Sequence, residues 1–204
     1  MGLGNALKEG KANQASYQNE NKLIGFFARV NYNYKGRYFV SASIRHEGSS
    51  QFGEDHKWGN FPAISLAWNI KGEQFLHNIQ AISTLKLRAG FGITGTEPGT
   101  PYLSLNKLNM GGYGYYNGKW TNLLRPDGNP NPDLRWEKKE ELNIGLDFGF
   151  ISDRISGSID FYNRETKDLI GDYQVPVPPY FSPWIKANAG SIRNTGLEVS
   201  LNIV

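Results

Sequence analysis

The sequence predicts an all-β fold in which antiparallel strands form part of a transmembrane β-barrel. Three observations lead to this fold class: apolar and polar residues alternate through long segments, the alternation recurs in about eight segments, and tight turns are interspersed with long polar loops. The segments exceed the usual strand length of about five or six residues, which favours a barrel. A soluble β-sandwich, whose strands also alternate, is the alternative that these patterns leave open.

The strands are predicted in chain order. From Lys22 to Tyr34 every second residue is apolar or aromatic, and after a Lys35-Gly36 turn the alternation resumes through Ile44, which predicts a hairpin. A weaker segment, Trp184 to Arg193, precedes a predicted Asn194-Thr195 turn. Five other segments keep one face free of charge: Pro62 to Ile70, Leu85 to Ile93, Leu142 to Phe148, Ile155 to Phe161 and Leu197 to Ile203.

The connections between these strands differ at the two ends. Tight turns are predicted at Lys35-Gly36, around Ser152-Asp153 and at Asn194-Thr195, and long polar loops at 47–57, 95–134 and 165–183. Residues 71–84 are the exception, because Phe75, Leu76, Ile79 and Ile82 lie near helical spacing and predict a short helix at the short-turn end. In a membrane barrel the short turns are periplasmic and the long loops extracellular.

Aromatic residues are predicted to gather at both ends of the strands, as they do at the two membrane interfaces. The short-turn end carries Tyr32, Tyr34, Tyr38, Trp68 and Phe148, and the long-loop end carries Trp58 and Trp136.

The composition argues against several function classes. With 22 Lys and Arg against 19 Asp and Glu, the net charge is only +3 and marks no nucleic-acid surface. The absence of cysteine removes disulfides, thiolate metal sites and cysteine nucleophiles. We expect neither a spanning helix nor a signal peptide, since no stretch approaches the roughly 20 apolar residues that a membrane helix needs. A polar mean hydropathy does not argue against a membrane barrel, because the strands of such a barrel alternate lipid-facing and lumen-facing residues.

Several motifs with catalytic or metal-binding associations are better explained by strands and turns. Gly90 to Gly95 fits the dinucleotide pattern G-x-G-x-x-G, but strand alternation continues through it. His46, His56 and His77 fall in three different connections, so we expect no metal site. Asp127 to Asp133 is rich in oxygen ligands yet lacks the spacing of a calcium loop, which favours turn chemistry.

Glu137, Lys139 and Glu141 share one face of a predicted strand, and Arg88 lies on the polar face of another. A hydrolase that uses paired carboxylates needs its second carboxylate across a cleft. We therefore expect these four residues to form a hydrated, mutually ion-paired lumen wall, without catalytic chemistry.

Six blocks of sequence carry a family resemblance that covers most of the chain after residue 22. They read FFARVNYNYKGRYFVSASIRHEGSSQFG (26–53), WGNFPAISLAWNI (58–70), LKLRAGFGITGT (85–96), NPDLRWEKKEELNIGLDFGF (131–150), GSIDFYNRETKDLI (157–170) and NAGSIRNTGLEVSLNI (188–203). Together they resemble the SusC/RagA-like TonB-dependent outer-membrane transporters. The chain departs from the family at His46-Glu47-Gly48, where Arg-Asp-Gly is usual, and residues 1–20 match no block.

The resemblance implies a location in the bacterial outer membrane and import of a large nutrient, such as an oligosaccharide or peptide. Members of the family work with a SusD-like surface lipoprotein and draw energy from the TonB complex, through a plugged barrel of about 22 strands. We therefore expect residues 1–21 to be a polar loop remnant and residues 22–204 to be part of the internal to C-terminal barrel. The expected partners are these two proteins, the imported ligand and outer-membrane lipid; no cofactor, enzyme activity or nucleic acid is expected.

The loop 95–134 is the richest candidate for ligand contact. Its aromatic residues, Tyr113, Tyr115, Tyr116 and Trp120, interleave with Gly111, Gly112, Gly114 and Gly118. Such rings can stack on sugars or grip a peptide. A packed or lid-contacting loop explains the pattern about equally well, and the rival function is that of a soluble glycan-binding sandwich.

Overall fold

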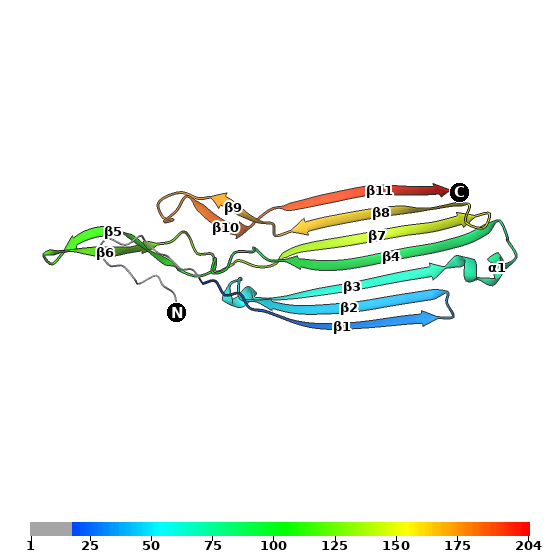
Figure 1. The fold of residues 1–204 in the computed structure, drawn as a ribbon, viewed down its shortest axis with the longest axis horizontal. Coiled ribbons are helices and arrows are strands. Elements are labelled where there is room, and N and C mark those ends of the chain that lie inside the picture. Colours follow the sequence, from blue (N-terminus) through cyan, green and yellow to red (C-terminus); the bar gives the residue numbers. More distant parts are fainter. Residues whose placement is uncertain (1–17) are drawn as a thin grey trace, which may run out of the picture.

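Seven long strands lie side by side in one antiparallel sheet of the computed structural model, which describes residues 18–204 (Figure 1). In sheet order they are β1 (Leu23–Tyr34), β2 (Tyr38–Ser49), β3 (Trp58–Asn69), β4 (Ile82–Thr96), β7 (Glu137–Phe150), β8 (Ile155–Lys167) and β11 (Ser191–Ile203). Each strand has 12 to 15 residues. Within the described residues β1 and β11 are edge strands, so the sheet is an unclosed part of a barrel. Most of the predicted loop remnant 1–21 lies outside the described residues.

The register of the strand pairs confirms the two predicted faces. Residues directly opposite in an antiparallel pair share a face. One continuous row across all seven strands is uncharged and mostly apolar: Tyr32, Val40, Leu66, Ala89, Ile144, Phe161 and Leu197. The adjacent row on the other face is small or polar throughout: Asn31, Ser41, Ser65, Gly90, Asn143, Tyr162 and Gly196. The sheet therefore has an apolar face and a polar face.

The predicted eighth strand does not join the sheet. Trp184–Asn188 is β10, which pairs with β9 (Ile170–Gln174) in a separate two-stranded sheet. The turn predicted at Asn194-Thr195 is also wrong, because β11 runs unbroken through both residues. The Thr195 hydroxyl donates to Asn163 Oδ1 across the strand pair at 3.0 Å, so these polar residues are satisfied inside a ladder. The chain turns earlier, at Gly190, whose φ of 80° favours glycine.

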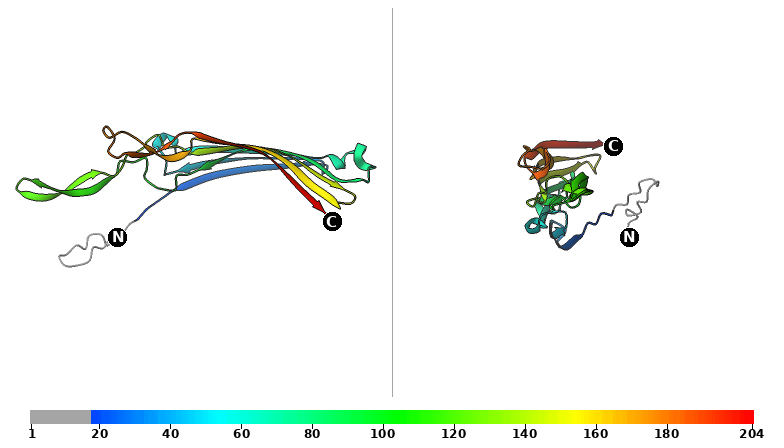
Figure 2. Two further views of the ribbon diagram at one scale, coloured as in Figure 1. Left: turned by 90° about the horizontal axis from the view of Figure 1, so that it is seen from above. Right: turned by 90° about the vertical axis from the view of Figure 1, so that its left-hand side faces the viewer.

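The long loops contain further structure that the sequence patterns did not predict. Residues 95–134 include the hairpin β5 (Leu108–Tyr116) and β6 (Lys119–Pro126), which projects beyond the sheet (Figure 2). Its turn is formed by Asn117 and Gly118, both with positive φ, as a two-residue hairpin requires. The 3-10 helix η2 (Glu54–His56) lies in the loop between β2 and β3.

The predicted helix at the short-turn end is present but shorter than residues 71–84. It consists of the 3-10 turn η3 (Ile70–Gly72) and the single turn α1 (Gln74–His77), since β4 already begins at Ile82. Among residues 18–204, no helix has the length and apolar character needed to cross a membrane. The glycines from Gly90 to Gly95 lie within β4, which confirms the strand interpretation of that motif.

A small core lies at the long-loop end, where β3 and β4 separate. Their pairing covers only residues 63–69 of β3, although each strand continues beyond it against its other neighbour. Four buried residues form this core: Phe52, Phe61, Leu134 and Trp136. A side chain at Gly95 would collide with Phe61 and Trp136, so the glycine makes room for them. The core joins β3 to the β4–β7 loop where backbone pairing stops.

The aromatic band at the long-loop end is only partly as predicted. Trp136 is 3% exposed and belongs to the core, where its indole N–H donates to the carbonyl of Lys57 at 2.9 Å. Trp58 is 50% exposed and stacks on His46, with ring centroids 4.6 Å apart. Phe26 continues the stack from the next strand.

One carboxylate fixes the aromatic residues at the short-turn end. Glu73 accepts hydrogen bonds from the Tyr38 hydroxyl at 2.6 Å and the Trp68 indole at 3.2 Å, and it pairs with Arg37 at 3.1 Å. The two rings stack with centroids 6.3 Å apart. The hydrogen bond from Tyr38 is the main cause that holds the pKa of Glu73 below its usual value, and the hydrogen bond from Trp68 lowers this pKa further.

This lowered pKa gives a testable pH dependence. A carboxyl whose pKa is depressed by folding stabilises the folded state above its unfolded pKa of about 4.3, and that stabilisation is lost as the pH falls through the folded pKa. In the full-length protein, Glu73→Ala is therefore expected to lower the thermal midpoint at pH 7, and the difference from wild type should shrink below about pH 4. Glu54→Ala, at an exposed position in η2, is the control. A loss of stability that is equal at both pH values would contradict this role.

Candidate functional site

The aromatic residues of the loop 95–134 lie on the projecting β5–β6 hairpin. In its register Tyr115 is opposite Trp120 and Tyr113 is opposite Asn122, so the three aromatic rings share one face. Tyr115 and Trp120 make an edge contact, with centroids 5.5 Å apart. Tyr116 is opposite Lys119 and lies on the other face. The structure thus brings together three of the four predicted ligand-contacting residues.

Three aliphatic residues extend this aromatic face toward the base of the hairpin. The register shift between Met110 and Tyr113 places one extra residue in β5, which is a β-bulge, and it keeps Met110 on the aromatic face. We call the resulting set the hairpin stripe: Leu108, Met110, Tyr113, Tyr115, Trp120 and Leu124, each at least 64% exposed. The sequence pattern missed the aliphatic members because the bulge interrupts the period of two.

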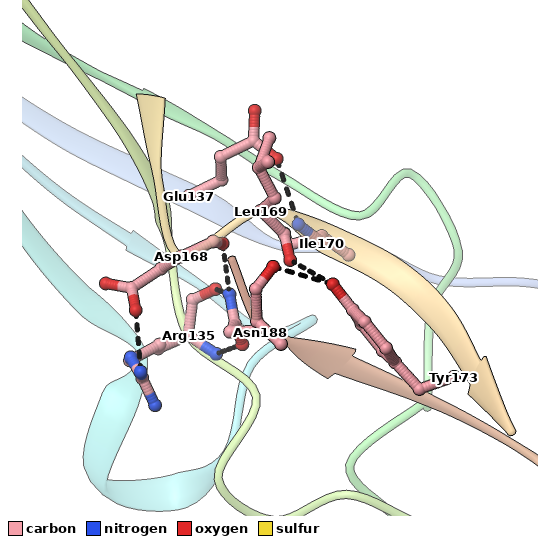
Figure 3. Close-up of polar contacts among 8 residues, drawn as sticks. Arg135, Glu137, Asp168, Leu169, Ile170, Tyr173 and Asn188 are labelled. Atoms are coloured by element: carbon pink, nitrogen blue, oxygen red, sulfur yellow. Dashed lines mark hydrogen bonds and ion pairs between the residues drawn. The ribbon is translucent and has the colours of Figure 1, made fainter. Parts of the chain in front are cut away.

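The segment just before β7 is tied to the region between β8 and β11 by the side chains of Arg135 and Asn188 (Figure 3). The Asn188 amide donates to the carbonyls of Arg135 at 2.7 Å and Asp168 at 2.9 Å, and its oxygen accepts the Arg135 N–H at 2.9 Å. Arg135 also pairs with the Asp168 carboxylate at 2.6 Å, which raises the pKa of Arg135 above its ordinary value. These bonds connect the segment just before β7 to both ends of the β9–β10 hairpin.

A second set of bonds begins in the segment predicted to be turn chemistry. The Asn129 amide donates to the carbonyls of Ser182 at 2.6 Å and Trp184 at 3.0 Å, and its oxygen accepts the N–H groups of Phe181 and Ser182. Asn131 donates to the carbonyl of Lys186 at 2.9 Å. The segment does turn at Gly128, where φ is 81°. Asn129 and Asn131 additionally bind the backbone of residues 181–186. The loop between β4 and β7 and the segment between β8 and β11 therefore form one unit.

The predicted polar residues of the strands fall into two ion-pair clusters and one separate contact. Arg88 makes a two-bond contact with Asp147 at 2.9 and 2.7 Å and reaches Asp160 at 2.9 Å across Gly145. Nearer the long loops, Glu141 binds Arg164 at 2.9 and 3.1 Å, and Lys139 lies 3.8 Å away. Glu137 joins neither cluster, since its carboxylate accepts the N–H of Ile170.

The arginine partners of this face follow from the register, which the sequence alone does not give. Arg164 is directly opposite Glu141. Among residues 18–204, no group of three or more His, Cys, Asp or Glu side chains is placed to hold a metal ion. The polar face thus carries arginine–carboxylate ion pairs.

Comparison with known proteins identifies the family. Residues 3–203 match the TonB dependent receptor-like β-barrel family. The chain belongs to the TonB-dependent receptor family. It is 40% identical over 193 residues to the TonB-dependent receptor SusC of Bacteroides thetaiotaomicron, which covers 93% of this chain and 19% of SusC. This confirms the SusC/RagA-like resemblance of the sequence blocks.

Solved structures support the same assignment for this TonB-dependent receptor chain. The RagAB peptide transporter is similar with a TM-score of 0.78 and 28% identity, over 94% of this chain and 21% of that one. The siderophore receptor PirA of Pseudomonas aeruginosa shares the fold, with a TM-score of 0.58 and 15% identity. The chain spans about a fifth of the length of SusC and of the RagAB chain.

The loop unit can be tested by removing one asparagine. In the full-length receptor, Asn129→Ala removes four hydrogen bonds, each worth about 1 kcal/mol, so amide exchange at Phe181 and Ser182 is expected to accelerate by about ten- to a hundredfold. Hydrogen–deuterium exchange of the two loops measures this effect. Asn122→Ala is the matched control, because the Asn122 side chain makes no hydrogen bond within the described part of the chain. Equal exchange in both variants would show that the loops are not joined in this way.

Proposed function

We propose that this chain forms part of the barrel wall of an outer-membrane TonB-dependent transporter that imports a large nutrient. The observation that carries the proposal is the uncharged row that crosses all seven strands beside a polar row. Strands of 12 to 15 residues exceed the roughly 9 to 11 that a tilted barrel strand needs to cross a bilayer. The apolar face would then meet lipid and the polar face the lumen.

The exposure of the apolar face supports a membrane barrel wall over a soluble sandwich. In a sandwich a second sheet covers that face. Here Val30, Ile64 and Leu197 are 69, 46 and 65% exposed, so no layer formed by residues 18–204 covers them. Lipid would supply the missing cover.

Substrate and partners belong to the complete transporter and are part of the same proposal. The substrate class is an oligosaccharide or a peptide, and the partners are a SusD-like surface lipoprotein and the TonB complex. The similarity to the RagAB peptide transporter supports a peptide, and the exposed rings of the hairpin stripe suit either ligand. The role of the chain is transport without catalysis.

The face assignment can be tested with two neighbouring residues of β7. In the full-length barrel Ile144→Arg is expected to cost roughly 2 to 4 kcal/mol if the residue lies near the bilayer midplane, whereas Asn143→Arg meets water and should cost little. Because a sandwich core would also reject Ile144→Arg, labelling is the deciding measurement. Cysteines at 142, 144 and 146 should react with a lipid-soluble probe, and cysteines at 143 and 145 with a membrane-impermeant reagent. The reverse pattern would overturn the membrane assignment.

The hairpin stripe gives a second test of this function. Each aromatic contact with a ligand is worth on the order of 1 kcal/mol, so the triple variant Tyr113→Ala/Tyr115→Ala/Trp120→Ala should weaken ligand affinity by about ten- to a hundredfold. Tyr116→Ala is the control, because Tyr116 lies on the opposite face of the same hairpin. Calorimetry and uptake by the full-length transporter measure the result. Unchanged affinity and uptake in the triple variant would rule out ligand capture by the stripe.

A further inference from the structure

The apolar face of β7, β8 and β11 ends in charged residues at the long-loop end. Along β7 from Leu142 toward the long loops, the next residues on the same face are Glu140 and Lys138, because side chains of one face recur at every second residue. The register adds residues from the two neighbouring strands. We call this set the outward charged belt: Lys138, Glu140, Glu165, Lys167 and Arg193.

The belt carries more positive charge than its own carboxylates neutralise. Lys167 pairs with Glu140 at 2.8 Å and lies 3.8 Å from Glu165, which in turn pairs with Arg193 at 3.1 Å. Lys138 has no carboxylate within 4 Å among the described residues, and the residue directly opposite it is another lysine, Lys167. Like charges in directly opposite positions destabilise a strand pair unless a counter-charge lies nearby. Three cations therefore share two carboxylates.

The location of the belt indicates which anion supplies the missing charge. If the apolar face meets lipid, as proposed above, the belt lies at the level of the lipid headgroups of the outer leaflet. Lys138 is exposed and the Arg193 side chain is 63% exposed, so both can reach a ligand outside the sheet. The row next to the belt contains Leu142, Asn163 and Thr195. The row beyond it contains Ile144, Phe161 and Leu197, which offers an apolar surface to acyl chains.

We infer that the outward charged belt binds a phosphate group carried by an outer-leaflet lipid. Lys138 and Arg193 hold the phosphate, and the ion-paired Lys167 stands behind it. The lipid is favoured over free phosphate, because its acyl chains pack on the apolar row while the headgroup meets the cations. This inference rests on the proposed membrane function and adds a ligand on the outside of the barrel wall.

The test compares lysines that are neighbours in sequence but lie on opposite faces. The full-length transporter is embedded in phosphatidylcholine nanodiscs, and its binding of diphosphoryl lipid A and of dephosphorylated lipid A is measured. A cation near an anionic lipid surface contributes about a factor of five to binding, so Lys138→Gln/Arg193→Gln is expected to weaken binding of the diphosphoryl form about tenfold or more. Lys139→Gln, which faces the lumen side, should leave binding unchanged. Glu140→Gln removes a competing carboxylate and should strengthen binding.

Three outcomes would overturn the inference: equal affinity for the two lipids, equal effects of the variants at 138 and 139, or full competition by inorganic phosphate. The last outcome would show a site for free anions. Heat-modified mobility on gels confirms that each variant is folded. Cysteine labelling at 143 and 144 separates the two proposals, since a normal labelling pattern without lipid A preference removes the lipid site and leaves the transport function standing.

Discussion

The register of the antiparallel strands is the constraint on which the rest of the structure depends. A slip of one residue in any pair would carry a charged side chain such as Arg88 onto the uncharged face. The contacts of the polar face oppose such a slip, because Arg88 meets Asp147 and Asp160 only in the observed register. Glu141 meets Arg164 in the same way. The ion pairs of one face therefore help to keep the central rows of the other face free of charge.

The long-loop end is held together by different forces, since the ladder between β3 and β4 stops below it. Phe61 and Trp136 fill the space between the separated strands, and the Trp136 indole is satisfied by a backbone carbonyl. Burial of these aromatic rings stabilises a region where fewer backbone bonds are available. The loops beyond this core then depend on side-chain to backbone bonds from Asn129, Asn131 and Asn188.

The sequence predicted the strands and their faces well because a period of two encodes both directly. The predictions from sequence failed where contacts between residues far apart in the chain determine the local structure or the burial of a side chain. Asn194 and Thr195 have turn-forming side chains, yet the ladder with β8 keeps them in a strand. Tryptophan is a residue type typical of membrane interfaces. The burial of Trp136 instead depends on Phe52 and Phe61, which lie more than seventy residues earlier. The position of Trp120 directly opposite Tyr115 depends on strand pairing that no local pattern specifies.

The asparagine bonds between the loops have a consequence for how such a surface can vary. Asn129 and Asn131 bind main-chain groups of residues 181–186, so the bonds place no demand on the side chains of that segment. Two of those side chains, Phe181 and Trp184, are 69 and 54% exposed. Their identity can change without loosening the unit, because the backbone partners stay the same. The loop end thus combines a fixed internal framework with an outer surface that is free to diversify.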